Sequence, residues 1–210
     1  MVLSTFSAMT VLMTLILDDY EQVTKNPTPK VEAETKRVIK TVMAEKVDKT
    51  IVQSLLPQGS RTAEFYGLPK NHKESVPLRL IVSACGGPLD KLTWFLEQIL
   101  SQLVKYVPAH LPDTDSYLQH LRESYANGFP PGTIIFSLDV TNLYGNIPID
   151  EAVQTVINLL QEHGHAINMF GLDLTDVERL LTHCLTNSFL RFGQTYYKQN
   201  MGLPMGSRIH

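Results

Sequence analysis

Apolar residues recur at helical spacing in five segments of this 210-residue chain. In such segments one side chain in every three or four is apolar, which is typical of helices with one buried face. Asp150 is expected to cap the fourth helix, and Thr175 with Glu178 to form a capping box at the start of the fifth. The five segments are 31–56, 88–107, 115–124, 150–160 and 175–184.

Runs of β-branched and apolar residues predict strands between these helices. Residues 78–84 (LRLIVSA) and 133–140 (TIIFSLDV) have the composition of strands, and the second run gives the strongest strand signal. Residues 189–192 and 195–199 flank a Gly-Gln pair, which predicts a β-hairpin. Residues 65–73 are expected to form a structured loop or a short strand. Because helices and strands mix without strict alternation, the pattern favours an α+β fold.

Composition narrows the class of protein. With 43% hydrophobic and 19% charged residues, the chain is not intrinsically disordered, and two cysteines are too few for a disulfide scaffold. The net charge of −3 hides an uneven distribution, because residues 111–180 carry −8 while both flanks are mildly basic. A solvated acidic face is the plain interpretation of that middle segment.

The first 17 residues carry no charged side chain and end before Asp18. A signal peptide needs a positively charged start, which is missing here, and a spanning helix needs about 20 mainly apolar residues. We expect a buried helix or a segment of uncertain origin, a nuclear or cytoplasmic location, and no membrane partner. A cleaved signal or a membrane anchor is the alternative that this segment leaves open.

Asp139 is the most informative polar residue in the chain. It follows the apolar run Ile134-Ile135-Phe136, and strand alternation would place it opposite the face of Leu138 and Val140. A carboxylate at the end of a buried strand is costly unless it is paired or binds a metal. The alternative is an aspartate that caps the turn at 141–142.

The run 139–148 (DVTNLYGNIP) resembles the first palm aspartate motif of reverse transcriptases, in the form found in Penelope-like retroelements. Three further blocks stand in the order of that family, so the resemblance covers roughly 60–207. They are the fingers-like block 65–83 (FYGLPKNHK, then PLRLIVS), the helix 88–107, and the run 197–207 (YKQNMGLPMGS).

This resemblance implies an RNA-directed DNA polymerase that adds dNTPs to a primer on an RNA template. Residues 1–60 would form an N-terminal helical region, 61–132 the fingers, and 133–210 part of the palm of a right-hand polymerase. Two Mg²⁺ ions would assist the reaction, and hard oxygen ligands suit them. In the family's pattern Asp139 is the catalytic metal ligand, and Val140 adds its backbone carbonyl.

The same resemblance implies residues that bind the incoming dNTP. Tyr144 matches an aromatic gate that excludes a ribose 2′-hydroxyl, and Gln199 matches a residue beside the nucleotide. Arg79 and Lys73, or Lys70, match cations that hold the triphosphate, a role that guanidinium geometry suits. Without the motif, Tyr144 would be a core aromatic and the cations ordinary surface residues.

Three residues of the last block match a loop that supports the template and primer. They are Gly202, Gly206 and Ser207, and glycines there allow backbone to approach nucleic acid closely. The alternative is an ordinary turn that follows the hairpin.

The chain departs from the family in one decisive respect. A palm also needs a Tyr-x-Asp-Asp block, but no aspartate follows Asp176. Leu80, Gly145 and residues 208–210 also leave the pattern. We therefore expect an enzyme fragment that is inactive alone, with exposed apolar surface where the palm is interrupted. The alternative is a non-catalytic nucleic-acid- or protein-binding module derived from a retroelement.

Overall fold

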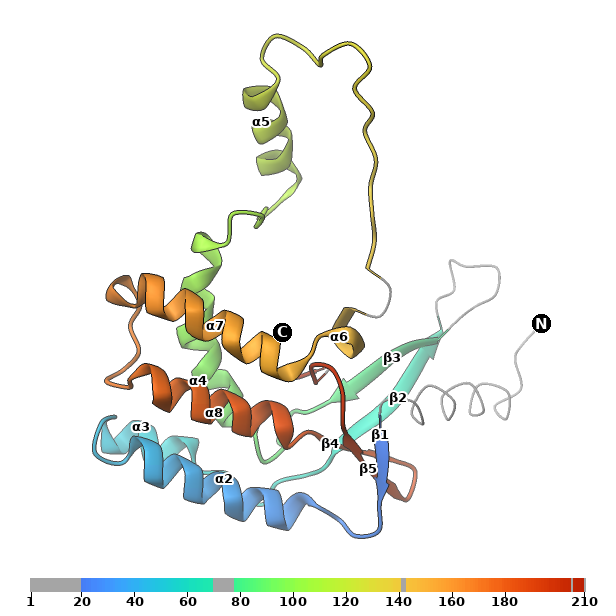
Figure 1. Ribbon diagram of the computed structural model, residues 1–210. Helices are drawn as coiled ribbons and strands as arrows, with labels where there is room; N and C mark the ends of the chain where they lie inside the picture. Colours follow the sequence, from blue (N-terminus) through green and yellow to red (C-terminus); the bar gives the residue numbers. More distant parts are fainter. Residues whose placement is uncertain (1–19, 70–77, 141–142, 205, 210) are drawn as a thin grey trace, which may run out of the picture.

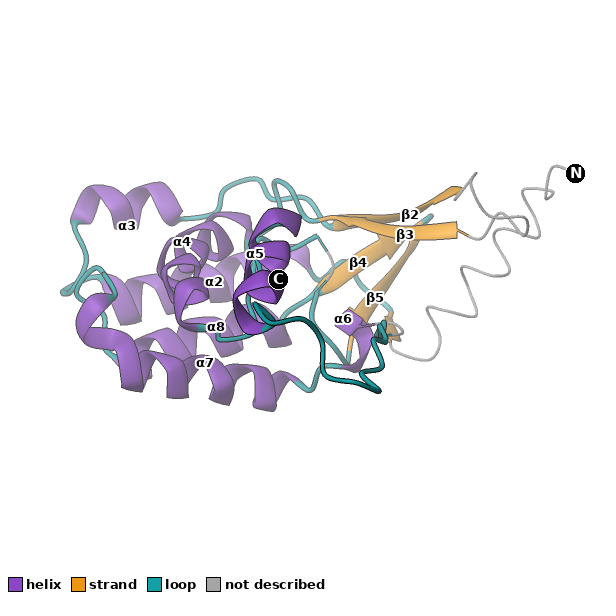
Figure 2. Cartoon of the chain, turned by 90° about the horizontal axis from the view of Figure 1, so that it is seen from above, coloured by secondary structure: helices purple, strands orange, loops and turns teal. Residues whose placement is uncertain are grey.

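The computed structural model describes residues 20–69, 78–140, 143–204 and 206–209. Helices gather at one end of the molecule, and a sheet extends from the other (Figures 1 and 2). The α+β class predicted from the sequence is confirmed. Lys70, Lys73 and the segment 1–17 lie outside the described residues.

Five α-helices form the helical end, and two short 3₁₀ helices, η1 and η2, continue α4 and α7. The helix predicted over 31–56 is two helices, because the chain turns at 44–48 and Asp48 caps the second by accepting the N–H of Thr50. The elements are α2 (Thr28–Met43), α3 (Lys49–Leu55), α4 (Asp90–Leu100), η1 (Ser101–Tyr106), α7 (Ile149–His163), η2 (Gly164–Ala166) and α8 (Leu174–Thr186).

Two predicted caps are wrong. Helix α7 begins at Ile149, so Asp150 lies in its first turn, where it makes no side-chain cap. The capping box of α8 is formed by Asp173 and Asp176, not by Thr175 and Glu178. The Asp173 carboxylate accepts the Asp176 N–H at 2.9 Å, and the Asp176 carboxylate accepts the Asp173 N–H at 3.0 Å. An earlier aspartate therefore starts the helix before the threonine that the sequence favoured.

The described strands form one sheet in the order β1-β5-β4-β2-β3. Neighbours are antiparallel except for β2 and β4, which are parallel. The predicted strand at 78–84 and the predicted hairpin are confirmed as β3 and as β4 with β5. The bounds are β1 (Tyr20–Val23), β2 (Ala63–Pro69), β3 (Leu78–Ser83), β4 (Phe189–Phe192) and β5 (Thr195–Gln199).

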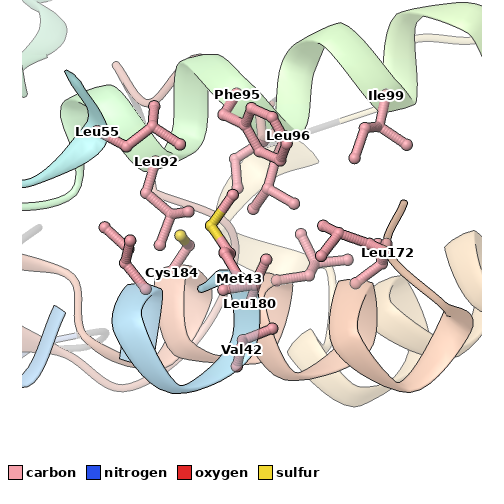
Figure 3. Packing of buried hydrophobic residues seen from close by; sticks show 14 of the residues in the cluster. Val42, Met43, Leu55, Leu92, Phe95, Leu96, Ile99, Leu172, Leu180 and Cys184 are labelled. Atoms are coloured by element: carbon pink, nitrogen blue, oxygen red, sulfur yellow. The ribbon is translucent and has the colours of Figure 1, made fainter. Parts of the chain in front are cut away.

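The main core lies between the helices (Figure 3). Ile39, Met43, Leu96 and Leu180 are fully buried there, so α2, α4 and α8 share one apolar interior. Burial raises the pKa of the Cys184 thiol, which packs in this interior. A smaller cluster holds the sheet together, with Phe65, Leu190 and Tyr197 at its centre.

An arch of chain, residues 107–140, leaves this body after η1 and precedes α6 (Leu143–Asn146) in the sequence (Figure 1). Its helix α5 (Thr114–Ser124) confirms the prediction for 115–124, but all its side chains stay at least partly exposed. Throughout the described part of the chain, no helix is long and apolar enough to cross a membrane.

The prediction of a strand at 133–140 is wrong in this structure. The segment pairs with no strand among the described residues, and its side chains are exposed. A strand needs a partner that completes its backbone hydrogen bonds, and composition alone supplies none.

Candidate functional site

The loop 200–204 lies directly against α6. The N–H of Leu203 donates to the carbonyl of Tyr144 at 2.7 Å. Gly202 has φ +74°, and a Cβ there would lie 2.3 Å from that carbonyl oxygen and 2.6 Å from Cα of Gly145. Only glycine fits this approach without movement of the backbone. Tyr144 and Gly202, which come from separate sequence blocks, therefore meet at one place.

Gly206, further along the same sequence block, reaches the sheet. Gly206 has φ +78°, and a Cβ there would lie 1.8 Å from the carbonyl oxygen of Val82 in β3. Any side chain at Gly206 would therefore displace the loop from the strand. Through Gly202 and Gly206, the last block contacts both the fingers-like block and the aspartate block of the sequence.

Gln199 fixes this loop from inside. It is 6% exposed at the end of β5, and its Nε2 donates to the carbonyls of Met201 at 2.8 Å and Leu203 at 3.1 Å. Both amide hydrogens are therefore used within the loop. Gln199 is therefore a buried residue that holds the loop 200–204 in place, and one of its partners, Leu203, also contacts Tyr144.

A contact that the sequence does not predict joins Arg208 to Asp90 at the start of α4. Nε of Arg208 donates to one carboxylate oxygen of Asp90 at 3.1 Å, and the other oxygen accepts the N–H of Gly86 at 2.8 Å. Ser207, which precedes Arg208 in the chain, is buried. Asp90 in the first turn of α4 is recognisable in the sequence as a typical helix-start residue, but its pairing with Arg208, 118 residues later, is not.

Asp139 and Val140 lie in the exposed segment 133–140. Val140 is 61% exposed, and Asp139 is also exposed. Among the described residues, no group of three or more His, Cys, Asp or Glu side chains is arranged to hold a metal ion. In the part of the chain that is described, Tyr144, Gln199 and Gly202 therefore lie together and Gly206 lies against β3, but no set of carboxylates that could hold a metal ion joins them.

The structure gives only limited information on two residues predicted to bind the dNTP, Arg79 and Tyr144. Arg79 belongs to β3, where its backbone pairs with Leu68 of β2. Tyr144 is half-buried in α6. Lys70 and Lys73 lie outside the described residues, so their place relative to Arg79 stays a prediction.

A polar hollow of about 350 Å³ lies on the sheet side, where α2 begins. Arg61 and Arg191 line it together with hydroxyl side chains, and Arg191 is paired with Glu64 of β2. Guanidinium and hydroxyl groups are donors that suit phosphate oxygens. The hydroxyl groups belong to Thr28, Ser60, Thr62, Ser83 and Tyr196.

Comparison with known proteins identifies no relative, since no family model, no curated protein and no solved structure matches the chain. The class that the structure itself defines is α+β, with a mixed open sheet of five strands in the described part.

Proposed function

We propose that this chain is part of an RNA-directed DNA polymerase of the Penelope-like kind, with fingers and the first part of a palm. The observation that carries the proposal is the contact between its motif blocks. Gly202 lies against Tyr144, and Gly206 lies against Val82, although these pairs are far apart in the sequence. Motifs that serve one site are expected to converge in this way.

The reaction of such an enzyme is attack by a primer 3′-hydroxyl on the α-phosphorus of a dNTP, with release of pyrophosphate. The proposed roles follow the motifs: Asp139 and Val140 as ligands of Mg²⁺, and Tyr144 as the gate against a ribose. One carboxylate and one carbonyl do not complete a site for two hard cations. The described residues therefore do not fit a full metal centre, and we derive no catalytic step through it.

A second candidate, a non-catalytic module, is favoured by the exposed Asp139, which belongs to no group of three or more His, Cys, Asp or Glu side chains that could hold a metal ion among the described residues. Such a module would bind nucleic acid or a protein without chemistry. The two candidates separate in an assay on the longest natural form of the protein. Extension of a primed RNA template with dNTPs and Mg²⁺, abolished by Asp139→Ala, supports the polymerase. Extension that survives Asp139→Ala would overturn the role of Asp139.

Nucleic-acid binding can be tested with the present chain. We expect it to bind a labelled RNA template annealed to a DNA primer, with an affinity that falls as salt rises, because phosphate contacts release counterions. Arg61→Ala should weaken binding several-fold. It should also lower the slope of log affinity against log salt concentration by about one, as expected for the loss of one phosphate contact. Arg122→Ala on α5 is the matched control. Fluorescence anisotropy measures both, and equal loss in the two variants would refute a role for the polar hollow.

A further inference from the structure

An apolar groove of about 390 Å³ runs between α4 with η1 on one side and α7 with α8 on the other. Apolar side chains dominate its lining, to which Leu203 and Ile209 near the C-terminal end of the chain also contribute. This lining is suited to other apolar side chains. The residues that form it include Leu100, Val104, Val156, Leu181, Leu185 and Leu203.

The segment 133–140 carries an apolar side of matching chemistry. In an extended chain alternate side chains share one side, which groups Ile134, Phe136, Leu138 and Val140. Their exposed fractions are 83%, 76%, 86% and 61%, so this side has no apolar cover. Contiguous exposed apolar surface of this kind marks an interaction site.

The helices that flank the arch in the sequence, η1 and α6, both contact the groove or its lining. At one end η1 contributes Val104 to the groove and leads directly into the arch. At the other end Tyr144 is hydrogen-bonded to Leu203, which also lines the groove. In Figure 1 the arch stands over α7, between these two contacts. The segment can therefore approach the groove while the helices stay in place.

We propose that residues 133–140 close over this groove within the same chain and insert the side chains of Ile134, Phe136 and Leu138. The position of both flanking helices at the groove favours the same chain over a second copy, because it keeps the segment at a high effective concentration near the groove. Asp139 lies on the opposite side of the segment and would remain open to solvent. The proposal does not depend on the proposed function.

The first test uses cysteine pairs in the full chain with Cys85→Ser, since Cys85 is exposed and Cys184 is buried. Leu138→Cys with Val156→Cys is compared with Ile135→Cys and Val156→Cys, which places the cysteine on the other side of the segment. Oxidation by copper phenanthroline should join the Leu138 pair within one chain, several-fold faster than the control. Equal rates, or cross-links found only between two chains, would overturn the proposal.

A second measurement does not depend on cross-linking. In a Trp94→Phe background, which removes the sole tryptophan, Phe136→Trp is compared with Ile135→Trp. The indole at 136 should emit at shorter wavelength and be quenched several-fold less by acrylamide, independently of protein concentration. Equal quenching at both positions would contradict closure. Protection that appears only as concentration rises would assign the groove to a second copy and refute closure within one chain.

Discussion

The backbone of Gly202 lies so close to Tyr144 that a Cβ at Gly202 would stand 2.3 Å from the Tyr144 carbonyl oxygen. This approach joins the loop after β5 to α6, and it depends on a glycine with positive φ. Even the methyl group of alanine at position 202 would therefore clash with the backbone of α6.

Gly202→Ala should therefore lower the free energy of unfolding by about 3 kcal/mol, from a strained φ together with a clash against backbone. Urea denaturation measures the change. Gly193→Ala is the matched control, because Gly193 has φ +61° but no atom within 4 Å of an added Cβ. We expect the control to cost only about 1 kcal/mol. Equal losses would show that Gly202 is not closely packed in solution.

Gln199 offers a test of the loop from its buried side. Gln199→Met keeps the volume but removes both donors, which leaves the carbonyls of Met201 and Leu203 without their partner. We expect a loss of about 2 kcal/mol in unfolding free energy, because buried acceptors lose their hydrogen bonds. The exposed Gln194→Met should change stability little. If both variants unfold at the same urea concentration, Gln199 does not support the loop.

The sequence pattern predicts correctly those elements that depend on residues close together in the sequence. The hairpin around Gly193 and the helix α4 follow from turn chemistry and periodicity within a short window. The segment 133–140 did not follow, because a strand also requires a partner that its own residues cannot specify. The same holds for Asp90 and Arg208, whose contact joins residues that no local window contains.

No local pattern in the sequence predicts that the loop after β5 meets α6. The structure brings the backbones of Gly202 and Tyr144 into contact, while their roles at one site stay a prediction from the resemblance. The inward orientation of the Gln199 amide was not predictable, since it depends on where the loop carbonyls turn.

Glu32 ties α2 to the chain before β2. Its carboxylate accepts from Nζ of Lys36 at 2.7 Å and from the N–H of Ser60 at 2.8 Å. The Lys36 hydrogen bond, followed by that from Ser60, lowers the pKa of Glu32 to about 2. Its stabilisation is present above the ordinary pKa of 4.5 and is lost as pH falls toward the lowered value.

Glu32→Gln should cost about 1 kcal/mol near neutral pH, since solvent screens this partly exposed group. The difference from wild type should shrink as pH falls through the acid range. Urea denaturation at a series of pH values measures it. Glu34→Gln is the control on the same helix, because Glu34 has a long ion pair with Lys30 at 3.9 Å. A loss for Glu32→Gln that is independent of pH would exclude the role of its charge.

His183 joins α8 to α2 through a defined pattern of hydrogen bonds. The hydroxyl of Thr35 donates to the carbonyl of Val31 at 2.8 Å, so it accepts from Nε2–H of His183 at 2.9 Å. Nδ1 of the ring then accepts from the amide of Asn187 at 3.2 Å. This arrangement requires a neutral ring, because a second ring N–H would face the amide donor.

Burial lowers the pKa of His183 below its ordinary 6.5, with a smaller opposing effect of Glu34 and a further lowering by Arg37. The unfolded chain therefore takes up the proton first, and stability should fall as pH decreases below 6.5. His183→Gln should flatten this part of the pH profile, while His120→Gln on the exposed face of α5 should leave it unchanged. Thermal unfolding between neutral and mildly acidic pH measures the slopes. Parallel profiles for wild type and His183→Gln would mean that the ring is not held neutral between α2 and α8.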